Sequence, residues 1–150
     1  ALDARDPCCG DARVSFANRP RPAIAAESTT IATILILEDD SFILQLAEIL
    51  LADQGHETLS AGDITQALAH LKATGPIDML FTDIRMNTDT LAGFEVARQG
   101  VALRPALRVL YVSGAEMTDE TTAMFVKGGT FLRKPYGETE LRTSVDAALH

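Results

Sequence analysis

From residue 33 to the end of the chain, short apolar runs alternate with longer amphipathic segments. The apolar runs have the length of strands and fall at 33–37, 56–60, 77–82, 108–112 and 130–133. The amphipathic segments have the length of helices and fall between Ser41 and Gly55 and at 64–73, 93–101, 118–127 and 139–149. Strands that alternate with helices favour a parallel sheet covered by helices. The sequence therefore predicts one α/β domain of five strand–helix units over residues 31–150.

Two of the expected helices carry clear N-terminal signals. Ser41 and Asp63 stand just before apolar periodic segments, where a short polar side chain can cap a helix. The apolar positions of the first helix are expected to face the core. They are Ile43, Leu44, Leu46, Ala47, Leu50 and Leu51.

Residues 1–30 differ from the rest of the chain, because they show no sustained apolar period and contain the segment Arg19-Pro20-Arg21-Pro22. We expect a disordered N-terminal extension here. The first residues lack the basic and apolar regions of a secretory signal, and no run reaches the roughly 18 apolar residues of a membrane span. These features predict a cytoplasmic protein with no membrane partner. The net charge of −8 argues against direct binding of nucleic acid.

Acidic side chains follow two of the expected strands at the point where each strand ends. Glu38, Asp39 and Asp40 come directly after the first strand, and Asp83 follows the third. The carboxyl ends of parallel strands meet at one edge of a sheet, which is where ligands bind in this class of fold. Carboxylates placed so close repel one another unless a cation relieves them, and Mg²⁺ prefers such oxygen ligands. The sequence therefore predicts a magnesium site.

A hydroxyl and an ammonium group join these acids at the same edge. Ser113 follows the fourth strand and Lys134 follows the fifth. A nucleophilic carboxylate, a divalent cation and two groups able to hold phosphoryl oxygens are what reversible phosphorylation of an aspartate requires.

At this point the chain resembles the receiver domains of two-component response regulators, the CheY-like superfamily, over about residues 31–150. The resemblance lies in four segments in a fixed order, which are Leu35-Ile36-Leu37-Glu38-Asp39-Asp40, Leu80-Phe81-Thr82-Asp83-Ile84-Arg85-Met86, Val112-Ser113-Gly114 and Phe131-Leu132-Arg133-Lys134-Pro135. It implies a doubly wound (βα)5 fold, with a five-stranded parallel sheet in the flavodoxin-like order 2-1-3-4-5.

The resemblance also implies a role for each site residue. Asp83 would be the phospho-acceptor and Asp39 a direct Mg²⁺ ligand, with the backbone carbonyl of Arg85 as a further ligand and Glu38 or Asp40 acting through water. Lys134 would hold the phosphoryl group, and the Lys134–Pro135 bond would be cis. Ser113 would be the switch hydroxyl and Phe131 the switch aromatic.

Partners follow from the same resemblance. The phosphoryl donor would be a histidine kinase or a phosphotransfer protein of a phosphorelay, and the signal would pass to an unknown downstream protein by protein–protein contact, with no DNA-binding output domain. The expected elements at 118–127, 130–133 and 139–149 form the candidate homodimer surface. The domain would not be an enzyme beyond its self-phosphorylation and self-dephosphorylation.

Two alternatives remain open at the level of sequence. One is a receiver domain excised from a hybrid histidine kinase. The other is a metal-dependent phosphohydrolase, which is disfavoured because such enzymes need a second acid two positions after the nucleophile, where this chain has Arg85. The chain departs from the resembling family in the loop Asn87-Thr88-Asp89-Thr90-Leu91-Ala92-Gly93, which we expect to be about two residues longer and more polar than the family's. The switch aromatic is also Phe rather than Tyr.

Overall fold

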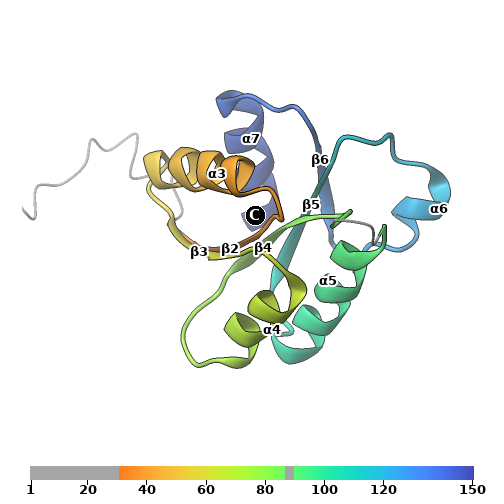
Figure 1. Cartoon of the computed structure of the whole chain (residues 1–150), viewed down its shortest axis with the longest axis horizontal. Helices are drawn as coiled ribbons and strands as arrows, with labels where there is room; N and C mark the ends of the chain where they lie inside the picture. Colours follow the sequence, from red (N-terminus) through yellow and green to blue (C-terminus); the bar gives the residue numbers. More distant parts are fainter. Residues whose placement is uncertain (1–30, 87–89) are drawn as a thin grey trace, which may run out of the picture. The chain divides into compact units, whose positions relative to one another are not determined.

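The computed structural model describes residues 31–86 and 90–150. Within these ranges the chain forms a parallel five-stranded sheet with helices on both faces (Figure 1). The strands are β2 (Thr33–Leu37), β3 (Glu57–Ala61), β4 (Met79–Asp83), β5 (Arg108–Ser113) and β6 (Thr130–Arg133). The helices are α3 (Ser41–Asp53), α4 (Ile64–Lys72), α5 (Ala92–Leu103), α6 (Asp119–Thr122) and α7 (Glu138–Leu149).

The strands lie in the order β3-β2-β4-β5-β6, and every adjacent pair is parallel. Counted along the described chain, this is the predicted order 2-1-3-4-5. The predicted fold class is therefore confirmed. All five strands run the same way, so their carboxyl ends meet at one edge of the sheet.

Two apolar layers hold the helices to the sheet. Helices α3 and α7 pack on one face through Leu51, Leu141 and Val145, and α4 and α5 pack on the other face (Figure 1). The central strands β2 and β4 are buried on both faces, as expected for a parallel sheet between two helical layers. Ala47 and Leu51 of α3 lie in the core as predicted. The expectation for Leu46 is wrong, because 44% of this residue remains exposed.

The N-terminus of α3 differs from the prediction by one residue. Asp40, not Ser41, is the N-cap, and its side chain accepts hydrogen bonds from the backbone N–H groups of Phe42 and Ile43. A carboxylate at this position satisfies donors that the first helical turn leaves open. The second predicted cap is confirmed, because Asp63 accepts a hydrogen bond from the Gln66 N–H at the start of α4.

The expected helix at 118–127 is wrong in length, because α6 covers only Asp119–Thr122. The backbone N–H of Val126 donates to the Tyr111 hydroxyl at 2.9 Å instead of to a helical carbonyl. Phe125 stacks on the Tyr111 ring, with ring centroids 4.2 Å apart. These two contacts with β5 draw the segment after α6 out of the helical path and onto the sheet.

Residues 31–150 form one compact unit, within which no described helix has the length and hydropathy needed to cross a bilayer. The extension expected at 1–30 and the first three residues of the loop after Met86 lie outside the described residues. The predictions made for them stay predictions.

Candidate functional site

The carboxyl ends of four strands bring the predicted site residues together. Glu38 and Asp39 follow β2, and Asp83 ends β4. Each of the three acids offers one carboxylate oxygen, and these oxygens lie within 4.8 Å of one another. Glu38 and Asp83 are buried, and Asp39 is partly buried. Asp40 is absent from this group, because its carboxylate is turned to the N-terminus of α3.

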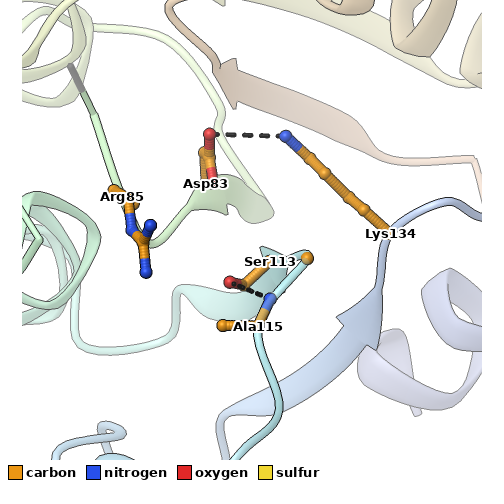
Figure 2. A pocket seen from close by; sticks show the side chains of 6 residues that line it. Asp83, Arg85, Ser113, Ala115 and Lys134 are labelled. Atoms are coloured by element: carbon orange, nitrogen blue, oxygen red, sulfur yellow. Dashed lines mark hydrogen bonds and ion pairs between the residues drawn. The ribbon is translucent and has the colours of Figure 1, made fainter.

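Lys134 crosses the edge of the sheet from the end of β6 and joins two of the acids. Its ammonium Nζ lies 2.7 Å from Glu38 Oε1 and 3.3 Å from Asp83 Oδ2. Figure 2 shows the Lys134 side chain extended toward Asp83. The bond between Lys134 and Pro135 is cis, as the resemblance implied. The Lys134 backbone is tied to β5 by a hydrogen bond from its N–H to the Ser113 carbonyl.

Burial controls the charge of this cluster. It raises the pKa of Glu38 to about 7, although the hydrogen bond from Lys134 opposes the rise. Burial also raises the pKa of Asp83, again against the lowering effect of Lys134. Burial alone would lower the pKa of Lys134, but the hydrogen bond to Glu38 and the charge of Asp83 outweigh it and leave that pKa raised. One ammonium therefore pairs with two buried carboxylates, and the pKa of each is raised by burial.

A cavity of about 340 Å³ opens beside Asp83 and is lined by Asp83, Arg85, Ser113, Gly114, Ala115 and Lys134. The Ser113 hydroxyl is buried and accepts a hydrogen bond from the backbone N–H of Ala115 at 3.1 Å (Figure 2). The cavity is large enough for a phosphoryl group, and it places a carboxylate, a hydroxyl and an ammonium group around the space. Phe131 is not among the described residues that line this cavity; it is paired in register with Tyr111 and partly buried against the core.

Sequence reasoning missed two residues that shape the site. Gly93, in the first turn of α5, packs so closely on β4 that an added Cβ would lie 2.4 Å from the Asp83 carbonyl oxygen. Tyr136 follows the cis proline, and its ring meets Phe81 edge to face. Burial and then the charges of Glu38 and Asp83 raise the pKa of Tyr136 to about 12, so its hydroxyl stays protonated near the acids. Gly93 could have been noticed as a glycine at the start of a predicted helix, whereas no sequence pattern indicated that Tyr136 lies near the acids.

Comparison with known proteins gives one consistent result. The family described as response regulator receiver domain matches residues 34–146. The chain is 31% identical over 117 residues to an uncharacterized transcriptional regulatory protein of Bacillus subtilis, YrkP, a match that covers 77% of this chain and 48% of the relative. It is 32% identical to the DNA-binding transcriptional regulator NtrC of Azospirillum brasilense, over 79% of this chain and 24% of that protein. The chain therefore spans half or less of the length of these two relatives.

Solved structures agree with the sequence matches. A response regulator receiver protein from Sinorhizobium medicae superposes with a TM-score of 0.71 and 29% identity, covering 79% of this chain and 94% of the other. The receiver domain of the hybrid histidine kinase CckA superposes with a TM-score of 0.65 and 28% identity, covering 79% of this chain and 99% of the other.

Proposed function

This chain belongs to the response regulator receiver domain family, and we propose on that premise that Asp83 is its phospho-acceptor. The observation that carries the proposal is the meeting of a buried carboxylate, two further acids, a hydroxyl and a lysine around one cavity. Asp83 ends a central strand, so its backbone is fixed while its side chain faces the cavity. The ammonium of Lys134 is already within 3.3 Å of that side chain.

Receiver domains bind Mg²⁺ at an acidic pocket, and the donor set of this chain fits the ion. Glu38, Asp39 and Asp83 supply the hard oxygen ligands that Mg²⁺ prefers, close enough together to share one ion. A bound ion supplies positive charge that offsets the acids and the phosphoryl oxygens. We assign the direct contacts to Asp39 and Asp83 and to the backbone carbonyl of Arg85. Of the two residues considered for contact through water, Glu38 lies in the acidic group and also holds Lys134, whereas the Asp40 carboxylate caps α3.

The reaction follows from where these groups lie. A carboxylate oxygen of Asp83 forms a bond to the phosphorus of a phosphohistidine while the phosphorus–nitrogen bond breaks, and the imidazole leaves with the electron pair. Lys134 donates to the phosphoryl oxygens from one side of the cavity. Ser113 gives up its present hydrogen bond from Ala115 and donates a hydrogen bond from its hydroxyl to the same group. Phe131 then moves toward the space that Ser113 leaves.

The donor we propose is a histidine kinase or a phosphotransfer protein. The signal would leave by contact with a downstream protein through the surface of α6, β6 and α7, which is also the candidate dimer surface. This part of the proposal follows the family, whose relatives here include transcriptional regulators as well as a hybrid kinase. Arg85 lines the cavity where a phosphohydrolase would need its second acid, so catalytic turnover of outside substrates is not favoured.

Intact-mass measurement after incubation with acetyl phosphate and Mg²⁺ tests the proposal. The wild type should gain the mass of one phosphoryl group, and Asp83→Asn should gain none. Asp119→Asn, which changes an aspartate of α6 outside the cavity, is the matched control and should be phosphorylated like the wild type. A wild type that gains no mass, or an Asp83→Asn variant that does, would refute the assignment. Repeated turnover of a phosphomonoester would support the hydrolase instead.

A further inference from the structure

Arg85 places a second cationic side chain at the cavity, and the proposed reaction uses only its backbone. It lies two residues after Asp83 and lines the cavity together with Ser113 and Lys134. Figure 2 shows the Arg85 and Lys134 side chains on opposite sides of the view, with Asp83 and Ser113 between them. Among the described residues, no carboxylate forms an ion pair with the Arg85 guanidinium. Because Arg85 lines the cavity, its side chain is a candidate to contact a ligand bound there.

The charges of the site suggest which ligand that is. In the resting state, three carboxylates surround one ammonium, and a bound divalent cation brings the cluster close to neutral. Phosphorylation removes the carboxylate charge of Asp83 but adds a phosphoryl group of about −1.5 to −2 charges at pH 7. The phosphorylated cluster then holds about half to one negative charge in excess. A guanidinium at the edge of the cavity would offset this excess once the cation and the phosphoryl group are both bound.

The geometry of the side chain agrees with this role. A guanidinium offers several N–H donors in a planar fork, which suits two oxygens of one phosphoryl group. We propose that the Arg85 side chain closes over the cavity and donates hydrogen bonds to the phosphoryl oxygens on Asp83, opposite Lys134. This inference rests on the proposed function, because it requires a phosphoryl group on Asp83. It makes Arg85 a phosphoryl-binding residue rather than a solvated surface arginine.

The proposal predicts that loss of the Arg85 guanidinium affects the affinities for two ligands differently. Arg85→Gln keeps the backbone carbonyl that we assign to the metal and removes only a positive charge near it. Mg²⁺ alone should therefore bind this variant as tightly as the wild type or up to about threefold more tightly. Trifluoroberyllate with Mg²⁺, a mimic of the phosphoryl group, should bind about fivefold more weakly, and the loss should shrink as salt is added. Damage to the fold would instead weaken both ligands.

Isothermal titration calorimetry on wild type, Arg85→Gln, Arg85→Lys and Arg108→Gln measures both affinities. Arg108 is the matched control, because it is an exposed arginine at the start of β5 and so lies at the opposite edge of the sheet. Arg108→Gln should keep both affinities within about twofold of the wild-type values. The trifluoroberyllate affinity of Arg85→Lys should lie between those of Arg85→Gln and the wild type.

Equal trifluoroberyllate affinities for Arg85→Gln and Arg108→Gln would overturn the proposal, as would an Arg85→Gln variant that loses affinity for Mg²⁺ as well. A wild type that binds Mg²⁺ but no trifluoroberyllate would refute the proposed function, and the role of Arg85 would fall with it. If the proposed function is right but the role of Arg85 is wrong, the wild type still binds trifluoroberyllate, and only the comparison of Arg85→Gln with Arg108→Gln reveals the failure.

Discussion

Replacing Gly93 by alanine tests how closely α5 must approach the strand that carries Asp83. The added Cβ would lie 2.4 Å from the Asp83 carbonyl oxygen and 2.6 Å from the Ile84 Cα. Ordinary contact begins at 3.4 Å, so α5 and β4 would have to separate by about 1 Å. Both neighbours are buried backbone atoms, one in the last residue of β4 and one in the residue after it, and neither can rotate away. The 2.9 Å hydrogen bond from the Gly93 N–H to the Ile84 carbonyl would stretch with them.

The change in the free energy of unfolding caused by Gly93→Ala can be estimated from these contacts. Overpacking of this size costs about 2 kcal/mol, and weakening the hydrogen bond costs about 1 kcal/mol more. Alanine is favoured over glycine in a helix by up to about 1 kcal/mol, which offsets part of the loss. The net destabilisation is about 2 kcal/mol, and it corresponds to a fall in Tm of about 8 °C for a domain of this size.

Gly100→Ala is the matched control, because it makes the same substitution in the same helix. Its Cβ would approach two leucine side chains, at 3.0 Å from Leu107 Cδ2 and 3.3 Å from Leu71 Cδ1. These ends can rotate, so the unfolding free energy should change by less than about 1 kcal/mol. Chemical denaturation followed by circular dichroism measures both variants. Equal midpoints for Gly93→Ala and Gly100→Ala would show that the close approach of α5 to β4 does not limit stability.

Three further predictions concern single polar contacts. Lys134→Met should lower the affinity for trifluoroberyllate with Mg²⁺ at least about tenfold, because it removes the ammonium beside Asp83; an unchanged affinity in calorimetry would contradict this. Burial lowers the pKa of His56 below its usual 6.5, so the unfolded state binds the proton more tightly. The His56 contribution to stability should therefore be present above pH 6.5 and fall away below it, which denaturation of wild type and His56→Gln across this range would detect. Tyr111→Phe should lower the unfolding free energy by about 1 kcal/mol, because the Val126 N–H loses its acceptor; a midpoint equal to that of the wild type would mean that water replaces the hydroxyl without loss.

The sequence predicted the strands and the sheet well because each depends on a local pattern. Buried parallel strands appear as short apolar runs, and the caps of α3 and α4 are short polar residues just before amphipathic segments. The end of α6 could not be found in this way. It depends on the Tyr111 hydroxyl and ring, which lie on β5 and become neighbours of residues 125 and 126 only after folding.

The site shows the same division between local and tertiary causes. The convergence of Asp39, Asp83 and Lys134 follows from strand direction alone, so it was predictable once the strands were placed. Which side chains pair with which was not predictable, because this depends on distances between side chains. Lys134 binds Glu38 more closely than Asp83, while Asp40 is used by its own helix.

The Lys134 bridge means that the resting protein carries its own counter-ion. A buried acidic cluster without one would push the sheet edge apart whenever metal ran short. Here the ammonium holds Glu38 and Asp83 together. Lys134 therefore offsets part of the repulsion between these two acids whether or not a cation occupies the site, and strand β6, far along the chain, is tied to strands β2 and β4 at their functional ends.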